Sequence, residues 1–84
     1  MESRTRLILL ILRACEEEGE DVSLREILEA LSPLIPEDLM GLSEEISTSY
    51  GDLPPRVAIS MMLRDPRWRD AVEEACRLYL SEGN

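Results

Sequence analysis

The sequence predicts an all-α fold, a compact bundle of about five short helices around a central apolar N-terminal helix. Aromatic residues are few (Trp68, Tyr50, Tyr79 and no Phe), so the core must consist of aliphatic side chains, which suit helices better than sheets. Caps and prolines divide the chain into five segments with helical periodicity, and no stretch shows sustained strand alternation. The 84 residues are expected to form one helical domain, residues 1–84, that buries roughly 60–65% of its unfolded surface.

The first helix is expected from Ser3 to about Glu18 and contains the run LILLIL, residues 7–12. Apolar side chains occupy two of its faces, with Leu9 between them, so this helix should lie at the centre of the bundle. Four other short helices need not cover it completely. A residual face around Leu9 would then be the seam for a homodimer or for a partner helix.

The second helix is expected over LREILEAL, residues 24–31. Ser23 and Glu26 form an S-x-x-E capping box at its start, and Pro33 stops it. The third helix should begin at Pro36, because proline needs no donor in the first turn. Its apolar stripe consists of Leu39, Leu42 and Ile46. The poor helix formers of STSYG, residues 47–51, predict that it frays before Gly51.

A fourth helix is expected to start at Pro54 and Pro55 and to run to about Arg64. Asp65 and Pro66 then restart the chain as N-cap and first residue of a fifth helix, which ends near residues 81–83. We expect this last helix to bury one stripe and to form i, i+4 ion pairs on its outer side. The stripe comprises Trp68, Val72, Ala75 and Tyr79, and the ion pairs are Arg69 with Glu73 and Glu73 with Arg77.

The formal charge of −9 is distributed unevenly along the chain. Residues 16–52 contain twelve acids and one Arg, which gives 1 − 12 = −11, whereas residues 53–70 contain four Arg and two Asp, which gives +2. The molecule should therefore present an acidic half and a smaller basic patch.

The basic patch includes Arg56, Ser60 and Arg64, spaced i, i+4 and i+8, which Arg67 can extend. The other residues of this fourth helix are apolar, so we expect it to be buried on most of its circumference, with only this stripe exposed. Two interpretations remain open. The arginines either bridge to the protein's own acidic half, or contact phosphate or an acidic protein surface.

Two cysteines, Cys15 and Cys76, lie far apart without a CxxC pattern, which excludes zinc ribbons and thioredoxin-like sites. They are expected either as small buried apolar residues or as a disulfide between the first and last helices, the latter in a hyperthermophile. All nine basic residues are Arg, and Gln is absent, which fits a thermophilic source or a GC-rich genome.

No pattern indicates catalysis, a cofactor or a metal site. His is absent, and neither a Gly-rich phosphate loop nor a D-x-D-x-D-G calcium loop occurs. The apolar run is too short for a membrane span and is followed by Arg13 and EEEGED rather than by a signal cleavage site. We expect a cytoplasmic protein that is not an enzyme.

Two stretches resemble helix-turn-helix and winged-helix domains. TRLILLILRACEEEGEDVSLREILEAL, residues 5–31, is similar to the apolar first helix, acidic turn and capped second helix of these families. LPPRVAISMMLRDPRW, residues 53–68, is similar to their recognition-helix segment. The resemblance implies that Arg56, Ser60 and Arg64 would face the DNA groove or phosphates.

Three functions follow, in order of preference. The first is a protein-docking or regulatory adaptor module, as a homodimer or with another protein, in transcription or replication machinery. The second is a helix-turn-helix DNA-binding regulator, which is disfavoured because a protein of pI near 4.4 repels the phosphate backbone. The third is an acidic nucleic-acid mimic that inhibits a nucleic-acid-binding protein, as some phage- and virus-encoded proteins do.

Overall fold

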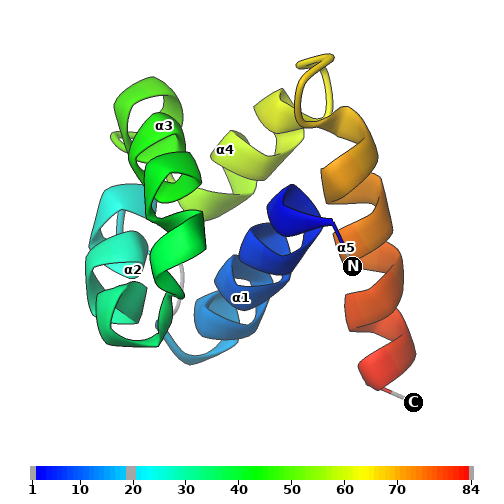
Figure 1. Cartoon of the computed structure of the whole chain (residues 1–84), viewed down its shortest axis with the longest axis horizontal. Helices are drawn as coiled ribbons and strands as arrows, with labels where there is room; N and C mark the ends of the chain where they lie inside the picture. The colour runs from blue at the N-terminus through cyan, green and yellow to red at the C-terminus, as the bar shows by residue number, and fades with distance from the viewer. Residues whose placement is uncertain (1, 19–20, 84) are drawn as a thin grey trace.

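The N-terminal helix α1 lies at the centre of the computed structural model, which describes residues 2–18 and 21–83. Figure 1 shows α1 between α2 and α3 on one side and α5 on the other, with its most extensive contacts made to α5. The described residues form five α-helices and two 3₁₀ turns, without a strand: α1 (Ser3–Glu18), α2 (Leu24–Leu31), η1 (Ser32–Leu34), η2 (Glu37–Leu39), α3 (Met40–Tyr50), α4 (Pro55–Met62) and α5 (Arg69–Glu82). The predicted all-α fold is confirmed. The radius of gyration, 11.6 Å, matches the ~12 Å of a compact chain of this length.

The chain itself covers most of the apolar run of α1, in which Leu10 and Leu12 are half-buried. Leu7, Ile8 and Ile11 are fully buried, as expected for a central helix. Leu9 is also buried, at 5% exposure, so the expectation of a residual open face around it is wrong. The reason lies in η2, residues 37–39, which packs against α1. The sequence predicted these residues as the start of the third helix, but α3 begins only at Met40.

The N-terminus of α2 is closed by the turn that follows α3. Ser23 caps the helix as predicted, since its hydroxyl accepts a hydrogen bond from the backbone N–H of Glu26 at 3.3 Å. The first two amides of the helix bind residues that are distant in sequence. Leu24 N–H donates to the carbonyl of Leu53 at 2.9 Å, and Arg25 N–H donates to the carbonyl of Gly51 at 3.0 Å. The orphan donors of this helix end are thereby satisfied within the fold.

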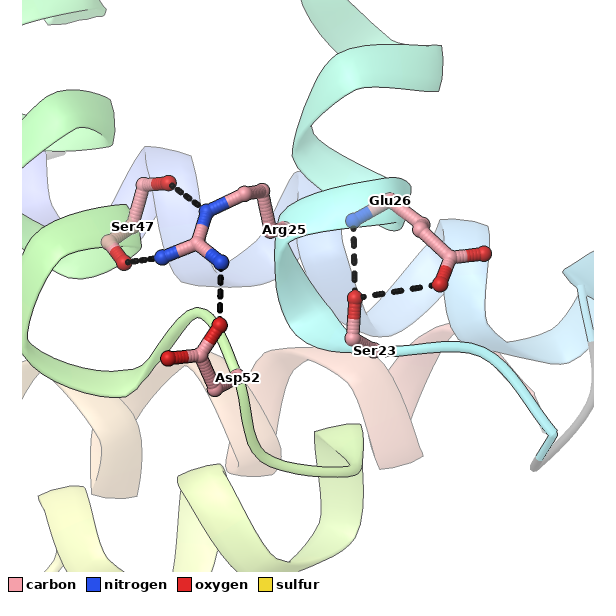
Figure 2. Close-up of polar contacts among 5 residues, drawn as sticks. All are labelled: Ser23, Arg25, Glu26, Ser47 and Asp52. Atoms are coloured by element: carbon pink, nitrogen blue, oxygen red, sulfur yellow. Dashed lines mark hydrogen bonds and ion pairs between the residues drawn. The ribbon is translucent and has the colours of Figure 1, made fainter.

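Arg25 joins α2, α3 and the following turn, as Figure 2 shows. Its Nε donates to the Ser47 hydroxyl at 3.2 Å and its Nη2 to the Ser47 carbonyl at 2.9 Å, while Nη1 pairs with Asp52. Gly51 is buried against this guanidinium, and a Cβ there would overlap the Ser47 carbonyl oxygen and lie 2.9 Å from Nη2 of Arg25. The close approach explains why glycine stands at this position.

These contacts also correct the expected end of α3. The helix continues to Tyr50 instead of fraying after Ile46. Weak helix propensity in residues 47–50 is offset because Arg25 binds Ser47, and because the Tyr50 hydroxyl donates to Asp65 at 2.8 Å. Tertiary hydrogen bonds therefore decide the length of this helix.

Replacing Arg25 with alanine is expected to lower the free energy of unfolding by about 1 kcal/mol, since three contacts are lost but the side chain is 41% exposed and solvent screens the charge. Urea unfolding followed by circular dichroism measures this loss. Arg77→Ala is the matched control, because among the described residues Arg77 pairs only with Glu74 on its own helix, and it is 71% exposed. Equal losses in the two variants would show that Arg25 does not hold α2 and α3 together.

The last helix starts later than predicted, at Arg69. Asp65 and Pro66 begin a tight turn rather than a helix: the Asp65 carboxylate accepts from Arg67 N–H at 2.9 Å, and its carbonyl accepts from Trp68 and Arg69. The predicted buried stripe is otherwise confirmed at Trp68, Val72 and Ala75, whereas Tyr79 is half-buried. The predicted i, i+4 ion pairs are wrong; the arginines of α5 pair with nearer acids, Arg69 with Asp70 and Arg77 with Glu74.

Candidate functional site

Helix α4 packs on the globule by one narrow stripe. Pro55, Ala58 and Met62, spaced i, i+3 and i+7, are its buried residues. Figure 1 places α4 between α3 and the N-terminal half of α5, and α5 is the element that contacts it most. A helix of two turns held at such an edge can bury only one side.

The outer side of α4 is exposed and largely apolar. Val57 is 44% exposed, Met61 47% and Leu63, just beyond the helix, 37%. These are three of the five large hydrophobic side chains that are exposed in the described part of the chain. The prediction that α4 is buried on most of its circumference is therefore wrong. We call the exposed surface the α4 face; it comprises Arg56, Val57, Ser60, Met61, Leu63 and Arg64.

The predicted stripe of Arg56, Ser60 and Arg64 lies within the α4 face, and all three residues are exposed. Arg56 and Ser60 are one turn apart on the helix, whereas Arg64 lies in the turn that follows, where its N–H donates to the carbonyl of Met61 at 3.0 Å. Arg56 already interacts with another group of the protein. The structure thus brings the three residues to one edge of the molecule, beside apolar residues that the sequence interpretation placed in the core.

Arg67, the predicted extension of the stripe, binds the protein's own acids. Its Nη1 lies 3.1 Å from a carboxylate oxygen of Glu45 on α3, and its Nη2 lies 3.4 Å from Asp65. Arg67 therefore agrees with the first of the two interpretations, in which the basic residues bridge to the protein's own acidic half. It joins the turn after α4 to α3, while its side chain stays 59% exposed.

Asp65 anchors the same turn through hydrogen bonds to its charged form. Donation from Arg67 N–H comes first and donation from the Tyr50 hydroxyl second, and together with the Arg67 guanidinium they hold the pKa of Asp65 below its ordinary value of 3.8. Burial is the main cause that raises the pKa of Tyr50, and its bond to Asp65 adds to the rise. An ionised carboxylate therefore holds the turn between α4 and α5.

Acid is expected to weaken this anchor. Because the pKa of Asp65 is lowered in the folded state, its stabilisation is present above 3.8 and is lost as the pH falls through the folded-state pKa. The drop in unfolding temperature between pH 7 and about pH 3 should be smaller in Asp65→Asn than in the wild type. Asp70→Asn is the control, since that carboxylate is 94% exposed; an identical acid-induced drop in Asp65→Asn and the wild type would contradict the assignment.

Two open hollows lie away from α4. One, of about 310 Å³, is bordered by Leu9, Leu10, Leu34, Pro36 and Leu39, with Arg6 and Arg13 at its rim. The predicted seam residue Leu9 lies at this hollow but is buried, whereas Leu34, at 69% exposure, and Pro36 are exposed there. Both rim arginines are paired, Arg6 with Asp38 at 3.5 Å and Arg13 with Glu82 at 2.6 Å.

The second hollow, of about 550 Å³, lies at the C-terminal ends of α1 and α5. Its polar groups bind one another: Arg13 pairs with Glu82, which lowers the pKa of that carboxyl, and a hydrogen bond to Glu16 is the main cause that raises the pKa of Tyr79 to about 12. These contacts join the C-terminal ends of the two helices.

The two cysteines are free, half-buried thiols, so of the two expectations the structure has the small apolar residues and not the disulfide. Burial raises the pKa of Cys15 and of Cys76, which disfavours the reactive thiolate. Over residues 2–18 and 21–83, no cluster of three or more metal-ligating side chains is present, and none of the helices there is long and apolar enough to span a membrane.

The sequence interpretation missed Val57, Met61 and Leu63 as exposed residues. A signal for them existed: a helix of about ten residues between prolines has room for one buried stripe, so the apolar residues outside Pro55, Ala58 and Met62 had to face outward. It also missed Arg25, although a single arginine among twelve acids is a conspicuous candidate for a structural ion pair.

Comparison of the chain with protein-family models, with curated proteins and with solved structures gives no match. The geometry of the chain itself is therefore the basis for a functional assignment.

Proposed function

We propose that this protein is a non-enzymatic, cytoplasmic docking module, an adaptor that binds a protein partner through the α4 face. The observation that carries the proposal is that Val57, Met61 and Leu63 stay 37–47% exposed beside Arg56 and Arg64. Clustered exposed apolar residues with a polar rim are typical of protein interaction sites. Arginine and methionine are both enriched at such interfaces.

The packing of the molecule supports this interpretation. Most long aliphatic side chains of the described residues are buried, Leu9 of α1 among them. Leu34 and Leu80 are exposed on other elements, whereas the remaining three exposed ones, Val57, Met61 and Leu63, lie together at α4. The α4 face is open to solvent. It is not needed for the core, because Ala58 and Met62 already pack α4 against the globule. Exposed apolar area that does not stabilise the fold is available for an intermolecular contact.

Charge favours a protein over a nucleic acid as the partner. A DNA duplex gains affinity from phosphate neutralisation, and the chain carries a net charge of −9. Arg67, which a longer phosphate-binding stripe would require, is held by Glu45 and Asp65. Apolar contacts to a protein do not depend on a continuous basic surface.

Site-specific photo-crosslinking tests the proposal. A benzophenone amino acid replaces Val57 in one variant and Leu80 in a control variant; both side chains are exposed on helices, but Leu80 lies near the C-terminal end of α5. We expect discrete crosslinked proteins in source cells from position 57 only, and their loss when Met61→Glu is added. Identical crosslinking from the two positions, or none from position 57, would contradict docking through α4.

A gel shift with a random DNA duplex at low salt examines the other class of partner. We expect no retention below about 10 μM, the weak end of non-specific binding. Retention that disappears in the Arg56→Ala/Arg64→Ala variant would replace the protein-docking proposal with DNA binding.

A further inference from the structure

The nine arginines of this chain act mainly as carboxylate binders between or within helices. Arg13 binds Glu82 across α1 and α5, Arg67 binds Glu45 of α3, and Arg25 binds Asp52 of the turn after α3. Arg64 differs: its guanidinium forms no ion pair or hydrogen bond with any residue that the structure describes, although the chain contains eighteen acids. An exposed arginine without an acid therefore lies at the end of the α4 face.

The surroundings of Arg64 offer it no available carboxylate. No acid occurs from Leu53 to Arg64, and Asp65, which follows it, is held by the Tyr50 hydroxyl and the Arg67 amide. The apolar residues Val57 and Met61 are spaced i and i+4 and so lie side by side on α4. The α4 face thus combines two apolar anchors with positive charge, in a molecule that is acidic elsewhere.

A second copy of the chain does not fit this face. In a two-fold pairing of α4 with itself, the α4 face of the second copy offers Arg64 no carboxylate, because residues 53–64 contain no acid. The complementary surface is one with apolar anchors and carboxylates.

We propose that the α4 face binds an acidic amphipathic helix of a partner protein, whose apolar residues cover Val57 and Met61 and whose carboxylate pairs with Arg64. This inference rests on the proposed function, since it names the chemistry of the partner for the same surface. An eight-residue helix is only about 12 Å long, so it contacts about two turns of the partner. The small contact makes the complex weak and transient.

Two synthetic peptides of about 18 residues, long enough to form helix, test the proposal in an NMR titration of the labelled protein. Both carry leucine at positions i, i+3, i+4 and i+7; one has glutamate at the flanking positions, the other lysine. We expect the glutamate peptide to shift the amide resonances of residues 57–64, and to do so less strongly as salt is raised. The lysine peptide, although attracted by the acidic half, should leave residues 57–64 unshifted.

Matched variants locate the contact. Met61→Glu and Arg64→Glu should each weaken binding of the glutamate peptide by about tenfold, because one removes an apolar anchor and the other reverses the charge that meets the carboxylate. Leu80→Glu and Arg77→Glu are the controls, since both residues are exposed on α5 away from α4, and neither should change the affinity.

Three results would overturn the proposal: no shift at residues 57–64 up to about 1 mM glutamate peptide, equal binding of the lysine peptide at α4, or an unchanged affinity in Arg64→Glu. Shifts at these residues that grow with protein concentration alone would instead assign the face to a second copy. If the peptide titration fails while crosslinking from position 57 captures a protein, only the acidic chemistry of the partner is wrong. Failure of both the titration and the crosslinking would contradict the docking function itself.

Discussion

Leu9→Glu is expected to unfold the protein. Leu9 is 5% exposed on the central helix, so the substitution removes about 2–5 kcal/mol of apolar burial and adds several kcal/mol for desolvating a carboxylate. The whole stability of an 84-residue domain is about 4–13 kcal/mol. Far-UV circular dichroism should show loss of helix at neutral pH.

Leu34→Glu is the matched control for this experiment. Leu34 borders the same hollow as Leu9 but is 69% exposed, so its substitution should leave the circular dichroism spectrum unchanged. A folded, monomeric Leu9→Glu protein obtained from an oligomeric wild type would contradict the burial of Leu9. It would restore the seam between copies that the sequence alone suggested.

Trp68→Ala is expected to lower the free energy of unfolding by about 3–5 kcal/mol, the cost of emptying a large buried site. Trp68 is 1% exposed and lies at the junction of the Asp65 turn and α5. The guanidinium of Arg4 lies 5.3 Å from the ring centroid, so the indole also connects the start of α1 to this junction. Thermal unfolding should shift downward by about 12–40 °C.

Arg4→Ala separates the two roles of the indole. It removes the cation–π contact, which is worth about 0.5–1 kcal/mol at a partly exposed site, together with an exposed ion pair to Glu2 at 3.6 Å. The loss of unfolding free energy in Trp68→Phe should lie between those of Trp68→Ala and Arg4→Ala, since this variant retains a buried ring. If Trp68→Ala destabilises no more than Arg4→Ala, the indole is not part of the core.

The sequence predicted the elements well where local signals were strong. The capping box at Ser23 and Glu26 placed α2 correctly, and the aliphatic composition indicated the all-α class. The predictions failed where contacts between distant residues decide the outcome. α3 extends to Tyr50 because Arg25 and Asp65 bind its last turn, and no local pattern in STSYG reveals these partners.

The candidate site was predicted in part, for the same reason. Polar spacing identified Arg56, Ser60 and Arg64 as exposed. It could not show that Arg67 is held by Glu45, because that acid lies 22 residues earlier in the chain. Nor could hydrophobicity alone show that Met61 is exposed, since burial depends on how many elements surround α4, and α5 is the one that contacts it most.

Thermal unfolding of a Val57→Asp/Met61→Asp variant tests most directly whether the α4 face serves a partner rather than the fold. Both side chains are 44–47% exposed, so we predict an unfolding temperature within about 4 °C of the wild type, together with loss of glutamate-peptide binding. A decrease of more than about 10 °C would show that these residues stabilise the protein's own core. The α4 face would then not be a docking surface.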